Sequence, residues 1–213
     1  DDIILDFFSG SATTAHAVMK QNAETKDNRK YIMIQLPEET PEDSEARKAG
    51  YNTIPEIAKE RIRRAGKKIK EESPLTTQNL DTGFRVFRLA DSNFEEVKKA
   101  PGEYDQAQLD LFLNNVKSDR TDLDLLFGAM LSWGVQLSLP MTSEEVDGKM
   151  IYSVNNGDLV ACFADDITEN IVRAMADKQP LRVLFRDSCF ARDDAKINVF
   201  ETLKQLLDWS EEE

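Results

Sequence analysis

The first part of the chain alternates between strand-like and helix-like segments, and this order constrains the fold more than any other feature. The apolar run Ile3–Leu5 ends in Asp6 and leads into a turn of small residues that contains Gly10. Residues 12–22 carry apolar side chains at helical spacing, and Tyr31–Ile34 form a second apolar run. Strand, helix and strand joined by short connections are the unit of a parallel sheet. The sequence therefore predicts an α/β fold that begins with a β-α-β-α lobe.

The residues at the ends of these two strands favour a polar ligand. Parallel sheets bind ligands at the carboxyl ends of their strands, which is where Asp6 and Gln35–Glu38 fall. The helix that follows would present unpaired N–H groups at its start. Three hydroxyls stand there, those of Ser11, Thr13 and Thr14. We expect at least one of them to cap the helix, and we expect the turn, a cationic ligand, or both, to satisfy the carboxylate.

Length and composition indicate a globular chain that could form one large or two small cores. It has 213 residues, of which 40% are hydrophobic and 31% charged. No apolar run approaches the ~20 residues that span a bilayer, and the first residues do not resemble a signal peptide. Cys162 and Cys189 form neither a disulfide framework nor a metal-ligand spacing, so we expect two small buried apolar residues in a reducing cytoplasm.

Charge is distributed unevenly along the chain. Residues 1–80 carry 13 Lys and Arg against 14 Asp and Glu, whereas residues 81–213 carry 14 against 26. Such an acidic second part repels phosphate backbones and is better suited to a protein partner. The helix predicted from Ile54 to Lys70, in the first part of the chain, is strongly basic, because seven of its last twelve residues are Lys or Arg. A solvated helix face is the favoured interpretation of these bases, and a DNA-contacting face is the alternative.

A polar segment at 73–82 is interpreted as a linker, which divides the chain into an N-terminal lobe (1–72) and an α+β domain (83–213). Hairpin turns are expected at Asp147-Gly148 and Asn156-Gly157. The strands predicted in this domain are Phe84–Leu89, Val135–Leu139, Glu145–Val146, Lys149–Val154, Leu159–Phe163 and Leu181–Phe185, and the helices are 105–117, 122–133, a short one starting at Thr168, and Lys196–Leu207.

The run from Asp6 to Val18, DFFSGSATTAHAV, resembles motif I of the beta-class amino DNA methyltransferases. Within that class it is most similar to the modification (Mod) subunits of type III restriction-modification systems. Tyr31–Glu38 resembles the next cofactor-contacting strand of the family, and Ile57–Ile62 resembles the helix after it. The likeness continues through segments of 83–198, so it is expected to extend over nearly the whole chain.

The resemblance implies a Rossmann-like lobe with an S-adenosylmethionine site. The residues that it assigns to cofactor binding are Asp6, Phe7, Phe8, Gly10, Ser11, Thr13, Gln35 and Pro37. Two positions depart from the family pattern. Gln35 stands where an acid usually binds the ribose, and an amide lacks the charge assistance of a carboxylate. Ala12 stands where glycine is common, and its methyl group either packs under the helix or crowds the cofactor.

The resemblance places catalysis outside this chain. The family holds its target base with a motif that contains two consecutive prolines, and none of the seven prolines here has a proline neighbour. In this family the motif precedes motif I, so we expect a C-terminal piece of a longer adenine-specific methyltransferase, with no catalytic residue and no metal site in this chain.

The expected partners are DNA through the parent protein, and a second Mod subunit and the restriction subunit through 83–213. Two alternatives remain open. One is a nucleotide- or NAD-binding α/β enzyme, although the fingerprint Gly-x-Gly-x-x-Gly is absent. The other is an assembly module that binds no ligand.

Overall fold

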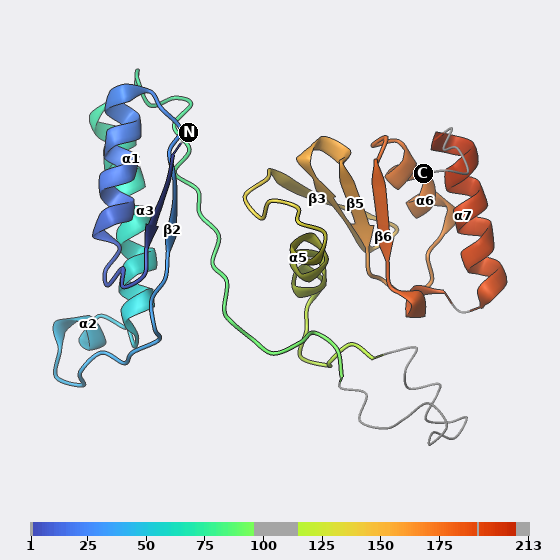
Figure 1. Cartoon of the computed structure of the whole chain (residues 1–213), viewed down its shortest axis with the longest axis horizontal. Coiled ribbons are helices and arrows are strands. Elements are labelled where there is room, and N and C mark those ends of the chain that lie inside the picture. Colours follow the sequence, from blue (N-terminus) through green and yellow to red (C-terminus); the bar gives the residue numbers. More distant parts are fainter. Residues whose placement is uncertain (1, 96–114, 191, 208–213) are drawn as a thin grey trace. The chain divides into compact units, whose positions relative to one another are not determined.

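The computed structural model describes residues 2–95, 115–190 and 192–207, and the chain divides into two compact units (Figure 1). Unit 1 is Asp1–Val86 and unit 2 is Phe87–Glu213. The predicted linker at 73–82 is part of unit 1, where Leu80 and Phe84 pack against its core. Both units combine helices and strands, as an α/β fold requires. No helix among the described residues is both long enough and apolar enough to cross a membrane.

Unit 1 has the strand–helix–strand order that the sequence predicts. Its elements are β1 (Ile3–Asp6), α1 (Thr13–Thr25), β2 (Lys30–Met33), α2 (Glu45–Lys48) and α3 (Ile54–Glu72). The two strands pair in parallel, with Ile3 opposite Lys30 and Asp6 opposite Met33. Both strands therefore end at the same edge of the sheet, and the turn into α1 begins there.

Helices α1 and α3 pack against each other and against one face of the two strands (Figure 1). Tyr31 and Met33 project from β2 into this core. The fully buried contributors are mostly small, which lets the two helices approach closely; they are Ala12, Ala15, Met19, Ala58, Ile62, Ala65 and Ile69. α3 begins where it does because Pro55 occupies its first turn and the Glu56 carboxylate accepts the Thr53 N–H at 3.1 Å.

The opposite face of the β1–β2 sheet is apolar and exposed. Ile3 is 64% exposed, Leu5 48% and Ile32 49%, and Ile34 continues the row beyond β2. Parallel sheets normally have both faces covered. Unit 1 thus presents an apolar sheet surface of the kind that other polypeptide usually buries.

Unit 2 is built on a four-stranded mixed sheet in the order β3-β4-β5-β6. Its elements are α5 (Asp122–Ser132), β3 (Met141–Val146), β4 (Lys149–Val154), β5 (Leu159–Cys162), α6 (Glu169–Ala176), β6 (Arg182–Phe185) and α7 (Asp193–Leu207). The first three strands are antiparallel and β6 runs parallel to β5. The two predicted turns, at Asp147-Gly148 and around Asn156-Gly157, connect these antiparallel strands.

Two predicted strands do not form. Residues 84–89 have no regular secondary structure: Phe84 packs within unit 1, the Phe87 ring meets Phe127 of unit 2 edge-on at 5.0 Å, and Val86 and Leu89 are exposed. Residues 135–139 form turns after α5, and their apolar side chains pack onto the core beneath that helix. Most of the helix predicted at 105–117 lies outside the described residues, and 115–117 are not helical.

Both cysteines are buried in unit 2, as the sequence predicts. The exposed fraction is 0% for Cys162 and 1% for Cys189, and the Cys189 thiol lies 4.0 Å from the Cys162 carbonyl oxygen. The two are free thiols rather than a disulfide. Burial raises the pKa of each thiol, because desolvation disfavours the thiolate.

We expect neither thiol to react with a thiolate-specific reagent in the folded protein at pH 8. Both should react fully once the protein is unfolded in guanidinium chloride, because the reactive species is the thiolate and burial suppresses it. Colorimetric thiol titration of the native and the unfolded protein measures the difference. Stoichiometric labelling of the native protein would contradict this account.

Unit 1 buries Ile62 but exposes Ile32, so the same substitution at the two positions should affect stability differently. Ile62→Ala in α3 removes a side chain that is 5% exposed and should lower the free energy of unfolding by about 2–5 kcal/mol. Ile32→Ala on the exposed sheet face makes the same chemical change and should have a much smaller effect. Denaturant unfolding followed by far-UV circular dichroism compares the two variants. Equal losses would mean that the sheet face is covered in this chain.

Candidate functional site

The turn between β1 and α1 is organised around the carboxylate of Asp6. One carboxylate oxygen, Oδ1, accepts the backbone N–H of Phe8 at 3.2 Å. The other, Oδ2, accepts the hydroxyl of Thr14 at 2.6 Å. The turn therefore satisfies this acid from within, as expected for a carboxylate at the end of a half-buried strand. The two contacts join the strand, the turn and the first turn of α1.

The end of β2 holds the other side of the same turn. The Ser9 N–H donates to the Ile34 carbonyl oxygen at 3.2 Å, and the Gly10 N–H donates to Oε1 of Gln35 at 2.8 Å. Gly10 has a φ of +51°, a backbone conformation that glycine adopts without strain. The amide oxygen of Gln35 thus positions the turn, and its NH₂ group has no partner among the described residues. An acid at this position would accept the same N–H but would have nothing to donate to a ligand.

The start of α1 differs from the expectation in one respect. The N-cap position is occupied by Ala12, in the left-handed conformation (φ 60°, ψ 43°), and no side chain caps the helix. The predicted hydroxyl cap is therefore wrong, since the Thr14 hydroxyl binds Asp6 instead. Without a cap, the N–H groups of the first turn remain available to an anionic or carbonyl oxygen.

The position of Ala12 decides between the two alternatives that the sequence left open. Its side chain is 0% exposed and lies in the core formed by α1 and α3. The methyl group therefore packs under the helix and does not project into the space above the turn. The left-handed backbone that it adopts explains why glycine suits this position, because an L-residue pays a conformational strain there.

The remaining predicted residues surround the turn with apolar and hydroxyl groups. Phe7 is 61% exposed and Phe8 82% exposed, which is unusual for phenylalanine in a folded unit. Ser11 is partly buried, and Thr13 and Pro37 are exposed. The structure thus brings Asp6, Gly10 and Gln35 together by hydrogen bonds through the turn, whereas no described hydrogen bond ties Ser11, Thr13 or Pro37 to them.

Two residues of the site, Thr14 and Ser9, are not among the predicted cofactor-binding residues. Thr14 is a hydroxyl at the helix start, and its spacing of eight residues from Asp6, across a tight turn, is the signal for their contact. Ser9 is buried at 6% exposure, and its hydroxyl donates to the Ile34 carbonyl oxygen at 3.4 Å. Nothing in the sequence distinguishes Ser9 from an ordinary turn serine, because only the pairing of the strands brings Ile34 to it.

Part of the chain is similar in sequence to known proteins. No protein-family model matches the chain. The Mod subunit of the type III restriction-modification enzyme StyLTI from Salmonella typhimurium is 47% identical over 90 residues, which cover 42% of this chain and 14% of that subunit. The EcoP15I Mod subunit from Escherichia coli is 45% identical over 89 residues, covering 42% and 12%. The EcoPI Mod subunit from Escherichia phage P1 is 39% identical over 92 residues, covering 43% and 14%.

The extent of these matches corrects one expectation. The resemblance was expected to extend over nearly the whole chain, but each match spans a little over two fifths of it and about one seventh or less of the relative. An identity of 39–47% over some 90 residues nevertheless supports common ancestry for that part. Over the matched stretch, the chain is related to the Mod subunits of type III restriction-modification enzymes.

Proposed function

We propose that this chain is part of a type III Mod subunit and that the β1–α1 turn is one wall of its S-adenosylmethionine site. The observation that carries the proposal is the arrangement at the shared end of β1 and β2. There a glycine turn is held by Asp6 and Gln35, and it leads into a helix that no side chain caps. The relatedness to Mod subunits of type III restriction-modification enzymes supports this interpretation.

The residues present suit the chemical parts of that cofactor. The uncapped start of α1 offers N–H donors to a carboxylate such as that of the methionine moiety. The unpartnered NH₂ group of Gln35 could donate to a ribose hydroxyl. The exposed rings of Phe7 and Phe8 offer π-faces to a sulfonium cation or to a planar base. When bound, the cofactor would supply an electrophilic methyl group, and these residues would hold it in place.

The proposal assigns methyl transfer to the longer parent protein and not to this chain. No consecutive prolines occur in the sequence, so the motif that holds the target base in this class is not supplied here. The exposed apolar face of β1 and β2 is consistent with further methyltransferase strands and helices packing there. DNA and adenine-N6 specificity belong to that parent.

For unit 2 we propose a protein-binding role, in dimerisation of Mod or in docking of the restriction subunit. The second part of the chain carries most of the negative charge, which disfavours direct DNA contact. Unit 2 also exposes large apolar side chains near the end of α5 and the start of β6: Leu131 at 70%, Leu181 at 74%, and Trp133 at 45% with Arg182 over its ring. Aromatic and arginine side chains of this kind are typical of protein interfaces.

The cofactor proposal predicts a specific response to two matched glycine changes. Gly10 and Gly50 both have positive φ, and an added methyl group would meet no atom within 4 Å at either position. Both Gly10→Ala and Gly50→Ala should strain the backbone without a steric clash, Gly50→Ala the more strongly because its φ of +91° lies outside the left-handed region, but only Gly10→Ala should weaken binding, by about tenfold, because it lies in the proposed site.

Titration calorimetry with S-adenosylmethionine and with NAD measures this effect and separates the rival functions. S-adenosylmethionine should bind and NAD should not. Binding of NAD alone would favour the nucleotide-enzyme alternative. Absence of any cofactor binding, in this chain and in the intact parent protein, would favour the assembly module.

The role proposed for unit 2 predicts the result of a deletion in the intact protein. Removing residues 87–213, the whole of unit 2, should abolish capture of the restriction subunit in a pull-down while cofactor binding by the remainder persists. The cofactor measurement serves as the control for folding. Full capture of the partner by the shortened protein would contradict the assignment.

A further inference from the structure

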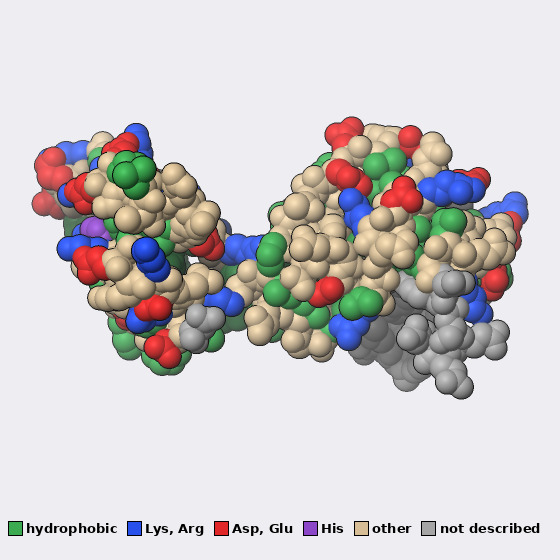
Figure 2. Space-filling view, turned by 90° about the horizontal axis from the view of Figure 1, so that it is seen from above, with side chains coloured by type: hydrophobic (Ala, Val, Ile, Leu, Met, Phe, Trp, Pro, Cys, Tyr) green, Lys and Arg blue, Asp and Glu red, His purple; other side chains and the backbone are tan. Residues whose placement is uncertain are grey.

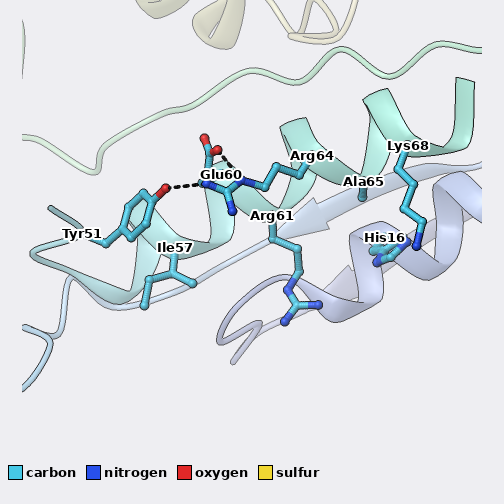
Figure 3. Close-up of a pocket in the computed structure, with 8 residues that line it drawn as sticks. All are labelled: His16, Tyr51, Ile57, Glu60, Arg61, Arg64, Ala65 and Lys68. Carbon is cyan, nitrogen blue, oxygen red and sulfur yellow. Dashed lines mark hydrogen bonds and ion pairs between the residues drawn. The ribbon is translucent and has the colours of Figure 1, made fainter. Parts of the chain in front are cut away.

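An open groove runs between α1 and α3, on the outer side of the two helices (Figure 3). It consists of two adjoining hollows of about 330 and 470 Å³ that share His16 and Lys68. The first hollow is also lined by Glu60, Arg61 and Arg64. The first hollow thus holds three fixed positive charges, one negative charge, Tyr51 and the only histidine of the chain, whereas the second sets Lys20 and Lys68 against Glu24 and Glu72, so the excess of positive charge lies in the first hollow.

Most bases of α3 are paired with acids of the same helix. Glu60 contacts both Arg63 and Arg64, at 3.8 and 2.6 Å. Lys67 and Lys68 lie 3.8 and 3.6 Å from acids one turn further along, Glu71 and Glu72. Figure 2 shows Lys and Arg side chains intermixed with Asp and Glu side chains over the face of the molecule that it draws. These pairs explain much of the basic run in the sequence as an ordinary solvated helix face.

Among the described residues, three bases of α3 have no such pair, namely Lys59, Arg61 and Lys70, and Arg61 is the one of them that lines the groove. Its Nε atom is shielded from solvent and has no hydrogen-bond partner, and its guanidinium makes no hydrogen bond or ion pair with any described residue. A shielded donor without an acceptor is unfavourable, and a guanidinium is the side chain best shaped to bind an oxyanion with two parallel hydrogen bonds. Figure 3 shows the Arg61 side chain reaching from α3 into the hollow, toward the loop that leads into α1.

We propose that the α1–α3 groove binds phosphate and that Arg61 is its principal donor, with His16 and Lys68 as flanking contacts. The ligand that this shape favours is the backbone of DNA, because the groove is open and continues from one hollow into the next along the helices. A free phosphate compound offers the same chemistry and is the other possible source. The inference does not rest on the cofactor proposal, since none of the predicted cofactor-binding residues lines either hollow.

The test is binding of a short labelled DNA duplex to the 213-residue chain, measured by fluorescence anisotropy between about 50 and 200 mM salt without S-adenosylmethionine. Arg61→Gln should weaken binding about tenfold and reduce the slope of log affinity against log salt by about one. The matched control is Arg63→Gln, which removes the same charge from the same helix, but outside the groove, where Arg63 lies over the Phe84 ring. It should change the affinity by less than about twofold, as expected for an already paired surface charge.

Further arms identify the ligand and exclude a folding defect. Arg61→Lys should recover part of the affinity that Arg61→Gln loses. All variants should keep the thermal unfolding midpoint of the unchanged 213-residue chain. Titration with inorganic phosphate separates the sources: Arg61-dependent phosphate binding without DNA binding would identify a small phosphate compound. Equal losses in Arg61→Gln and Arg63→Gln, or no binding of either DNA or phosphate, would overturn the proposal.

Discussion

The parallel pairing of β1 with β2 is the interaction on which the candidate site depends. The ladder that sets Asp6 opposite Met33 continues past the strands, since the Ile34 N–H donates to the Asp6 carbonyl oxygen at 2.8 Å and the Ser9 N–H donates to that of Ile34. Only this continuation carries Gln35 to the N–H of Gly10. Each such hydrogen bond contributes about 0.5–1.5 kcal/mol, so together they restrict the turn to one conformation.

Two strands alone would not hold this arrangement, because an isolated two-stranded sheet is marginal in water. The support comes from the closely packed pair α1 and α3, whose small residues bury Met19 and Ile62 against Tyr31 and Met33 of β2. The same packing turns Ala12 inward and leaves the helix start uncapped. The packing of α1 on α3 thus forms the core on one face of the sheet and also accompanies the open polar turn at the edge of the sheet.

The sequence predicted most elements of unit 1 because their patterns are local. Helical spacing, apolar strand runs and the basic stripe of α3 each arise from the packing of a single element. Where a side chain has more than one possible partner, the sequence does not predict which partner it contacts. Thr14 is one of three candidates for a cap and binds Asp6 instead, and residues 84–89 alternate like a strand but form none, since Phe84 packs in unit 1 and Phe87 against Phe127 in unit 2. The basic run of α3 likewise contained no sign that Arg61, unlike Arg63 and Arg64, is unpaired.

The sequence by itself determined the order of strand, turn and helix, the glycine turn after Asp6, and the relationship to Mod subunits over part of the chain. Tertiary structure alone decided that Gln35 binds the turn, that Ala12 lies in the core, and that Arg61 faces a groove. The physical reason is the range of the interactions. Periodicity and turn chemistry act between neighbours in the chain, whereas these three residues are placed by elements that lie at least 25 residues apart in sequence and meet only in the fold.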